Sequence, residues 1–444
     1  MKNRIKQYLL AASMCVGLTA CSDFFEPIPG VQFGLDETFA SKQRTEEYLN
    51  NVYSYVREVT DAIHPNTYGG IFTEASLDGA NRWNKTYAEW TNGSFNSASA
   101  QASEYFSKYY QAIAKASTFI QNVDKCTEAA ASTRGKWKSE ARALRAYYYF
   151  ELLRLYGPIP LIGEDPIPLD ASLEELIKER NSVDECVNFI ATELQSAIDS
   201  GDLLQRAGKA NLGRMDVATC MALKAKLYLY WASPLFNGNT DQASVKNKDG
   251  KQLFPQTEDH SKWTQTRDAY ERFMTFATGQ GYKLTEVYTN GKLDPYASCR
   301  AAGEFFTTTW EAVDELIFVK LRDLYDYTYW VCPKFTDFQD TDVTGGGGYY
   351  TTQETVDLFF TKDGLTIEED PGYDKFEGIP GANNFTSGRY YDPNNPSRLY
   401  FDADKSKVLK QWKDREPRFY VNITYSGSIW LNEGKYNEEM RTDF

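Results

Sequence analysis

The sequence of 444 residues has little histidine and none of the common nucleotide or hydrolase motifs. Pro65 and Ser261 follow its two histidines, His64 and His260, so a His-Glu-x-x-His zinc site is excluded. A Gly-x-Ser-x-Gly elbow, a Walker loop and a Gly-x-Gly-x-x-Gly fingerprint are also missing. A glycosidase needs only two carboxylates about 5–10 Å apart, so the 62 acidic residues leave that alternative open. We expect a protein that binds its ligand and does not cut it.

Cysteine is too sparse and too scattered to build a disulfide scaffold. The chain has seven cysteines, and no pair of them has the Cys-x-x-Cys spacing of a redox motif or a zinc site. Beyond the first 21 residues an odd number remains, so at least one thiol is free. These five are Cys126, Cys186, Cys220, Cys299 and Cys332.

Positive charge is also in deficit, because 48 basic residues face 62 acidic ones. A nucleic-acid partner is therefore not expected, since such proteins need a basic surface to neutralise phosphates. With 42% apolar residues the chain is globular, and its length predicts two packed parts and not a single core.

The N-terminus has the pattern of a bacterial lipoprotein signal peptide. A basic start precedes the apolar run Tyr8 to Leu18, which is too short to span a bilayer, and the small residues Thr19 and Ala20 precede Cys21. We predict a signal peptide over 1–20 and acylation (palmitate) of Cys21, which would anchor the chain to a membrane. The alternative is a secreted protein that is cleaved nearby. No later stretch is long and apolar enough to span a membrane.

The first half of the sequence predicts a mainly α-helical fold. Apolar residues at helical spacing predict helices over 36–59, 102–124 and 134–156. Another helix starts at Ser182, where Glu185 completes a capping box, and others follow Asp216 and cover 261–279. The patterns at 143–146 and 222–225, both with alanine at each end, indicate a degenerate tetratricopeptide-like helical repeat.

The second half predicts long loops with a few short strands. It is rich in Gly, Asp, Asn and Tyr, with Gly345 to Gly348 in a row, and strands are expected at 316–319 and 419–423. Long loops on a rigid scaffold commonly carry binding groups.

Aromatic residues are abundant, with 31 Tyr, 26 Phe and nine Trp. Many of them pack helices together, but rings are interleaved with polar side chains over 81–90 and 325–330. This composition suits a saccharide, since a flat ring covers the apolar face of a pyranose and polar tips bind hydroxyls. The predicted glycan-binding residues are Trp83, Asn84, Tyr87, Trp90, Trp310, Tyr327, Tyr329 and Trp330.

Two acidic clusters have enough oxygen ligands for calcium but lack the EF-hand spacing. We expect solvated loops there, and neither a metal nor a cofactor. The clusters comprise Asp337, Asp340 and Asp342, and Glu368, Glu369, Asp370 and Asp374.

Four blocks, in order and behind the lipoprotein signal, resemble the SusD/RagB family of nutrient-binding lipoproteins. They are Arg134 to Pro160 (with Glu-Ala-Arg-Ala-Leu-Arg-Ala-Tyr-Tyr-Tyr-Phe at 140–150), Ala222 to Asn237, Thr352 to Asp357 and Asp414 to Phe419.

The resemblance implies a tetratricopeptide-like domain over 21–235 and a loop-rich RagB/SusD domain over 260–444. It also implies an outer-membrane lipoprotein, facing the cell exterior, that captures oligosaccharides and lies as a lid on a SusC-like TonB-dependent transporter. Some relatives take up peptides, so a peptide cargo is the alternative. Family members usually continue with a further Ala-Glu-Ala-type helix, so the resemblance implies that the chain, which ends at Phe444, either is truncated or lacks a helix pair.

Overall fold

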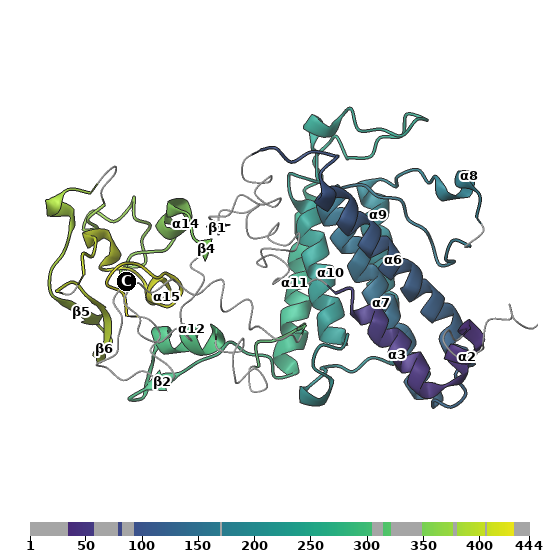
Figure 1. Ribbon diagram of the computed structural model, residues 1–444, viewed down its shortest axis with the longest axis horizontal. Coiled ribbons are helices and arrows are strands. Elements are labelled where there is room, and N and C mark those ends of the chain that lie inside the picture. Colours follow the sequence, from purple (N-terminus) through teal and green to yellow (C-terminus); the bar gives the residue numbers. More distant parts are fainter. Residues whose placement is uncertain are drawn as a thin grey trace, which may run out of the picture.

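The computed structural model describes residues 34–56, 79–81, 93–168, 171–303, 314–320, 349–375, 380–404 and 406–429 (Figure 1). Its first half is a series of helices in which α6 packs on α7, α7 on α9, α9 on α10, and α10 on α11. The mainly α-helical fold class is thus confirmed. These helices are α2 (Leu35–Ala40), α3 (Lys42–Tyr53), α6 (Ala100–Asn122), α7 (Ala131–Tyr156), α8 (Leu173–Leu176), α9 (Val183–Asp199), α10 (Val217–Ala232) and α11 (Ser261–Gly279).

The helix starts follow the capping signals in the sequence. Before α9, the Ser182 hydroxyl accepts a hydrogen bond from the Glu185 backbone N–H, and the Glu185 carboxylate accepts one from the Ser182 N–H at 2.7 Å. Before α10, the Asp216 carboxylate accepts from the Thr219 N–H at 2.7 Å. Each cap satisfies backbone donors that the first helical turn leaves unpaired.

The single helix predicted over 36–59 is wrong. The structure has two helices, with Ser41 extended between them (φ −98°, ψ 130°), and the second ends at Tyr53. The break lets the buried ring of Phe39 pack against both Tyr48 and Phe119, at centroid distances of 5.3 and 5.7 Å. Packing against α6 therefore outweighs the continuity of the local pattern.

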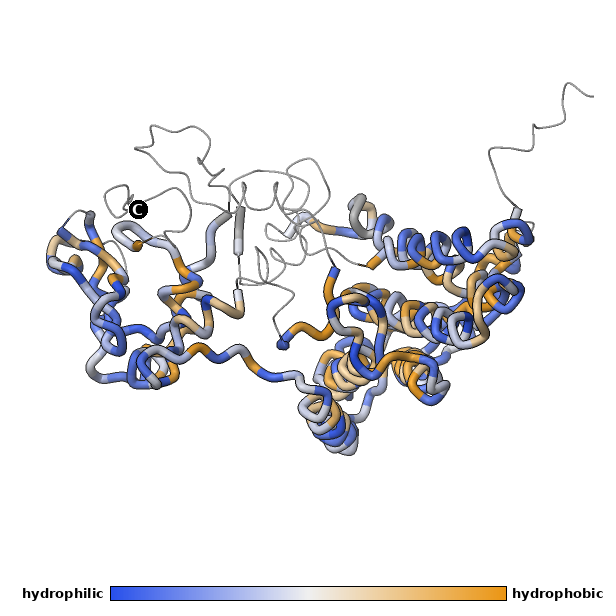
Figure 2. The backbone as a smooth tube through the Cα atoms, turned by 90° about the horizontal axis from the view of Figure 1, so that it is seen from below, coloured by the Kyte–Doolittle hydropathy of each residue, from blue (hydrophilic) through white to orange (hydrophobic). Residues whose placement is uncertain are grey.

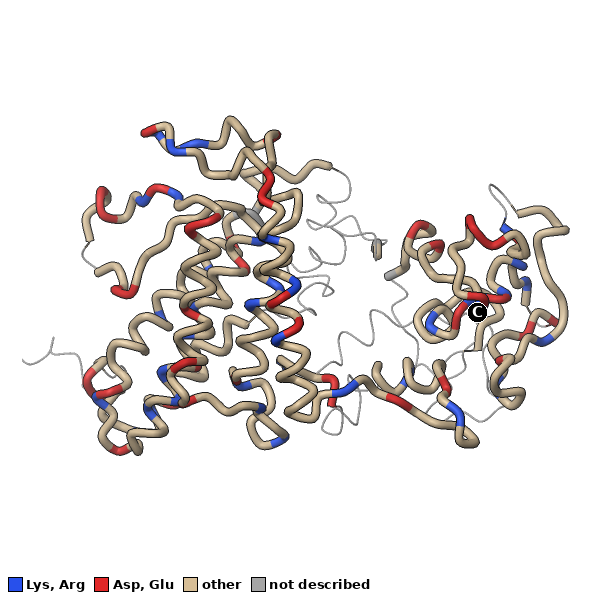
Figure 3. Tube along the Cα trace, turned by 180° about the vertical axis from the view of Figure 1, so that it is seen from behind, with Lys and Arg blue, Asp and Glu red and all other residues tan. Residues whose placement is uncertain are grey.

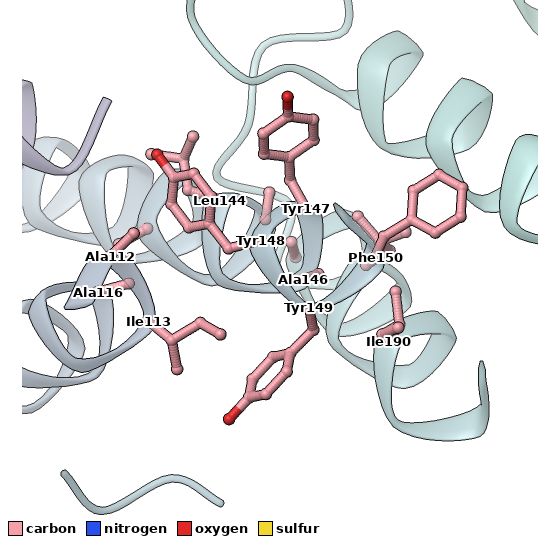
Figure 4. Packing of buried hydrophobic residues seen from close by; sticks show 14 of the residues in the cluster. Ala112, Ile113, Ala116, Leu144, Ala146, Tyr147, Tyr148, Tyr149, Phe150 and Ile190 are labelled. Carbon is pink, nitrogen blue, oxygen red and sulfur yellow. The ribbon is translucent and has the colours of Figure 1, made fainter. Parts of the chain in front are cut away.

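The central helix α7 is buried on all sides over its second half. Figure 4 shows the rings of Tyr147, Tyr148, Tyr149 and Phe150 leaving the helix in different directions. Tyr148 donates to the Val52 carbonyl of α3, whereas Tyr149 accepts from the backbone N–H of residue 162. A helix that is apolar all round needs neighbours on every face, and the adjacent helices and loops provide them.

The second half contains short elements around a smaller core. The link after α11 leads to the helices α12 (Pro295–Gly303), α14 (Gln353–Asp357) and α15 (Pro417–Asn422) (Figure 2). The antiparallel strand pairs are β1 (Ala80–Asn81) with β4 (Tyr349–Tyr350), β2 (Tyr288–Thr289) with β3 (Lys292–Leu293), and β5 (Arg389–Asp392) with β6 (Asn395–Asp402). Five 3₁₀ turns complete the described elements, namely η2 (Val123–Lys125), η3 (Lys209–Asn211), η4 (Thr240–Gln242), η8 (Ala382–Asn384) and η9 (Lys410–Trp412).

The two predicted strands are also wrong. Residues 419–422 belong to helix α15, which starts with Pro417 at its first turn, a position that suits the fixed φ of proline. Residues 316–319 contain no strand and are held by contacts with side chains from other segments.

Candidate functional site

The predicted functional side chains lie outside the described residues. This holds for Cys21, for the first acidic cluster and for all eight predicted glycan-binding residues: Trp83, Asn84, Tyr87, Trp90, Trp310, Tyr327, Tyr329 and Trp330. The structure does describe the segments that border them, and these meet at two junctions.

The first junction is the pairing of β1 with β4. Ala80 lies opposite Tyr350, and Asn81 lies opposite Tyr349. Asn81 is the first residue of the ring-rich stretch 81–90, and Tyr349 directly follows the segment that contains 325–330. Strand pairing therefore places the start of the stretch 81–90 beside Tyr349, although the two are far apart in the sequence.

The second junction is formed by Lys320, the last described residue before that segment. Its Nζ donates to the backbone carbonyl oxygens of Val56, at 2.6 Å, and Ser54, at 3.2 Å. Val56 is in turn the last described residue before 57–78. Residues 54–56, which follow α3, thus lie beside Lys320.

Loop 206–214, between α9 and α10, and the first turn of α10 hold residues 314–320 in place. Arg206 pairs with Asp314 at 2.9 Å, and the Thr219 hydroxyl donates to the Ile317 carbonyl at 3.2 Å. Gly213 has φ +85°, and a Cβ there would lie 2.8 Å from the Val319 carbonyl oxygen, so this approach requires glycine.

Two pockets flank this segment and share Leu212 and Gly213. One, of about 270 Å³, opens beside Tyr53, Phe318 and Lys320. The other, of about 280 Å³, is lined by Arg206 and Tyr282 among others. Both combine rings with hydrogen-bonding groups, as a small polar ligand such as a saccharide requires.

A polar network that includes Tyr53 and Arg214 lines one side of the first pocket. The Glu140 carboxylate accepts from the Tyr53 hydroxyl at 3.0 Å and pairs with Arg214 at 2.9 Å, while that hydroxyl accepts from the Met215 N–H at 2.8 Å. Burial raises the pKa of Glu140, and the neighbouring Arg214 partly offsets this. Burial also raises the pKa of Tyr53 well above its usual value. These groups fix the geometry of this side of the pocket.

The pocket beside Tyr282 is held by ion pairs. The Arg206 guanidinium lies 4.2 Å from the centre of the Tyr282 ring, and burial raises the pKa of Tyr282 to about 12. Hydrogen bonds from Arg206 and Lys283 lower the pKa of Asp314. Within the described part of the chain, Asp314 is the one carboxyl group that lines either pocket, so these walls supply no pair of carboxylates.

The second acidic cluster is solvated and internally bonded. Glu368 pairs with Lys375 at 3.1 Å, Glu369 accepts from the Thr366 hydroxyl, and Asp370 accepts from a backbone N–H. Over the residues that the structure covers, no three His, Cys, Asp or Glu side chains form a group that could hold a metal ion. His260 is an exposed residue before α11, and the four described cysteines are free thiols.

Reasoning from the sequence missed Tyr53, Arg214, Lys320 and the loop 206–214. Glu140 stands in a recognised block, but nothing local indicates its partner, because Arg214 comes from a loop two helices later. Helical spacing shows which faces are buried and does not show which polar groups meet across helices.

Two family models match this chain. The model described as "Starch-binding associating with outer membrane" matches residues 32–229, and the model described as "SusD family" matches residues 315–443. A SusD-like protein of Bacteroides ovatus is 27% identical over 175 residues, which are 38% of this chain and 30% of that protein.

The fold is shared with several solved structures. BT4246 has 24% identity and a TM-score of 0.70, over 88% of this chain and 66% of its own. A SusD-like protein (BF3747) of Bacteroides fragilis has 19% identity and a TM-score of 0.64, over 93% of this chain and 66% of its own. A SusD-like carbohydrate binding protein (BF0978) of the same species has 16% identity and a TM-score of 0.53, over 76% of this chain and 57% of its own.

The chain thus spans less than a third of the curated relative and just under two thirds of the first two solved structures. The two models match separate segments in the order that the sequence blocks predict, and the helical scaffold agrees with the solved structures. The chain belongs to the SusD/RagB family.

Proposed function

We propose that this chain captures oligosaccharides at the cell surface and delivers them intact to a SusC-like TonB-dependent transporter in the outer membrane. Membership of the family supports saccharide binding, and one structural neighbour is named as a carbohydrate-binding protein. The observation that carries the proposal is the pair of junctions, because the scaffold holds residues next to both ring-rich stretches: Asn81 pairs with Tyr349, and Lys320, shortly before 325–330, binds the Val56 carbonyl.

A single saccharide site then combines residues from both stretches. The rings of Trp83, Trp90 and Trp330 stack on pyranose faces, with Asn84 and the tyrosines binding hydroxyls. The remaining members of the proposed set are Tyr87, Trp310, Tyr327 and Tyr329. A rigid base is useful here, since ordering flexible loops at binding costs free energy. The buried Glu140–Arg214–Tyr53 network supplies such a base beneath one junction.

The chain is proposed to bind without catalysis and to be held at the outer membrane by lipid on Cys21, facing the cell exterior. Among the helices in the described ranges, none is long and apolar enough to cross a bilayer. The lipid therefore provides the anchor in this proposal.

The test is binding of the chain from Ser22 onward to soluble plant and host polysaccharides, followed by a check of each bound sample for breakdown products. We expect retention of a glycan that stays intact. Trp83→Ala and Trp330→Ala should each weaken its binding at least about tenfold, since buried tryptophans dominate binding energies. Trp263→Ala is the matched control, because Trp263 is 42% exposed on α11 and lies outside the proposed site.

Calorimetry distinguishes one shared site from two. A shared site gives one oligosaccharide per chain, and either substitution weakens that one event. Two separate sites give a stoichiometry of two, and each substitution removes one of them. Breakdown of the glycan would indicate an enzyme, whereas retention of peptides alone would indicate the alternative cargo.

A further inference from the structure

An apolar groove of about 410 Å³ lies on the helical part, away from both junctions. Its floor is the face of α6 that carries Phe106, Tyr110 and Ile113, and its other wall is formed by the loop 160–178 around α8. Two bonds hold this loop on α6: the Tyr110 hydroxyl donates to the Pro160 carbonyl at 2.7 Å, and Gln121 donates to Asp165 at 2.6 Å. The groove is therefore a fixed feature of the surface.

The groove leaves large apolar side chains in contact with water. Ile177 is 68% exposed, Leu176 52% and Phe106 39%, and all three line it. Leu173, in the same short helix, is 74% exposed. Contiguous exposed apolar residues of this size mark a surface that another segment or molecule covers.

We propose that this groove is covered by residues 22–33 of the same chain, which we call the tether. The tether contains five large apolar residues, Phe24, Phe25, Ile28, Val31 and Phe33. It also carries Asp23 and Glu26, which complement Lys178, the cation that lines the groove. Apolar content and charge thus both match.

The position and length of the tether also fit. It joins α2 at Gly34, and α2 is held beside the C-terminal end of α6 by an ion pair between Asp36 and Lys125 at 2.9 Å. Ile113 and Ser117 of the groove stand about 12–18 Å further along α6, at 1.5 Å per residue. Twelve extended residues reach about 40 Å. Because the tether is part of the chain, its effective concentration at the groove is high.

The test uses disulfide formation in the chain from Ser22, with Cys299→Ser and Cys332→Ser in every variant. Phe25→Cys is combined either with Ile177→Cys in the groove or, as the matched control, with Gln111→Cys. Gln111 is exposed on α6 next to Tyr110 but does not line the groove, so a tether that is free in solution reaches it as well. A disulfide forms only when the two Cβ atoms come within about 4.5 Å.

We expect the groove pair to form its intramolecular disulfide at least about tenfold faster than the control pair. Equal rates would overturn the proposal, because a tether free in solution samples both positions. Disulfide-linked dimers of the groove pair would also overturn it and assign the groove to a second copy.

A second readout does not depend on introduced cysteines. Ile177→Asp places a charge in the apolar groove and should release the tether, so proteolytic cleavage within 22–33 should increase about tenfold. Met274→Asp, at an exposed position on α11, should leave this cleavage unchanged. Equal cleavage in both variants would contradict docking of the tether. Neither result depends on glycan binding, so this inference and the proposed function fail separately.

Discussion

The ion pair between Arg145 and Glu193 gives the sharpest test of how this scaffold is held together. Arg145 is completely buried, and its Nε and Nη2 both donate to one oxygen of Glu193, with Nε at 2.8 Å. Its Nη1 donates to the Ser117 hydroxyl at 3.1 Å. The three residues join α7, α9 and α6, so the pair lies where three helices meet.

Removing one partner leaves an uncompensated buried charge. Glu193→Leu leaves the Arg145 guanidinium without its carboxylate, at an expected cost of about 3–5 kcal/mol in the free energy of unfolding. Arg145→Met should cost less, about 3 kcal/mol, because Arg142 still lies 3.6 Å from the Glu193 carboxylate. The double variant removes both buried charges. The Ser117 hydroxyl then loses this donor, and Arg142, whose side chain is 25% exposed, loses its carboxylate but keeps access to solvent, so the double variant should cost about 1 kcal/mol.

Urea unfolding of the four chains, followed by far-ultraviolet circular dichroism, measures these differences, because most of the helix lies in this part of the chain. The cost of the double variant in the free energy of unfolding should be at least about 3 kcal/mol smaller than the sum of the two single costs. If the costs simply add, the two charges do not depend on one another and the reasoning fails. Lys138→Met is the control, since its pair with Asp124 is largely exposed and should contribute less than about 1 kcal/mol.

Two further predictions concern other parts of the fold. Gly213→Ala should lower the free energy of unfolding by about 1–3 kcal/mol and increase proteolysis of residues 314–320, because the new Cβ would meet the Val319 carbonyl oxygen. Gly250 also has a positive φ but faces open space, so Gly250→Ala should lower the free energy of unfolding by at least about 1 kcal/mol less. Hydrogen bonds from Arg398 hold the pKa of Asp294 well below its usual value, so the ionised carboxylate stabilises the folded chain. This contribution to the free energy of unfolding is complete above about pH 4 and is lost as the pH falls further. Arg398→Met should lower stability at pH 7 and weaken this acid dependence, as measured by tyrosine near-ultraviolet dichroism against pH.

The helices could largely be predicted from the sequence, because one physical requirement, burial of a stripe at helical spacing, specifies them. On α6 the residues Tyr109, Ile113, Ala116 and Ile120 are all buried, as their spacing predicts. The break at Ser41 could not be predicted in this way. It depends on the contact of Phe39 with Phe119, and spacing within one helix carries no information about its neighbour.

The strands were harder to predict, because a short alternation of rings and branched residues does not distinguish a strand from one helical turn. Phe419 and Tyr420 are both buried, with ring centroids 5.2 Å apart, whereas a strand would place them on opposite faces. The hairpin β5–β6 was missed although residues 392–396, Asp-Pro-Asn-Asn-Pro, contain the residues typical of turns. The two ring-rich stretches of the proposed site lie outside the described residues and stay a prediction, whereas the pairing of β1 with β4 joins distant segments and could not be predicted from local spacing.

The blocks that identify the family contain buried polar side chains that hold the scaffold together. Glu140 and Arg145, from the first block, are buried in ion pairs with Arg214 and Glu193. Trp231, from the second, donates its indole N–H to Asp184 at 2.6 Å and lies under Lys262.

Arg415, from the last block, is buried and donates to the backbone carbonyl oxygens of Val356 and Phe359, so it closes the C-terminal end of α14. A buried guanidinium committed to the protein's own carbonyls cannot also select a sugar. Figure 3 shows charged residues along both parts of the chain, but Glu140, Arg145 and Arg415 of the identifying blocks are buried. Membership of the family therefore follows from the scaffold, whereas under the proposed function the identity of the glycan depends on the segments next to the two junctions. Exchanging those segments between relatives should transfer specificity while the scaffold stays unchanged.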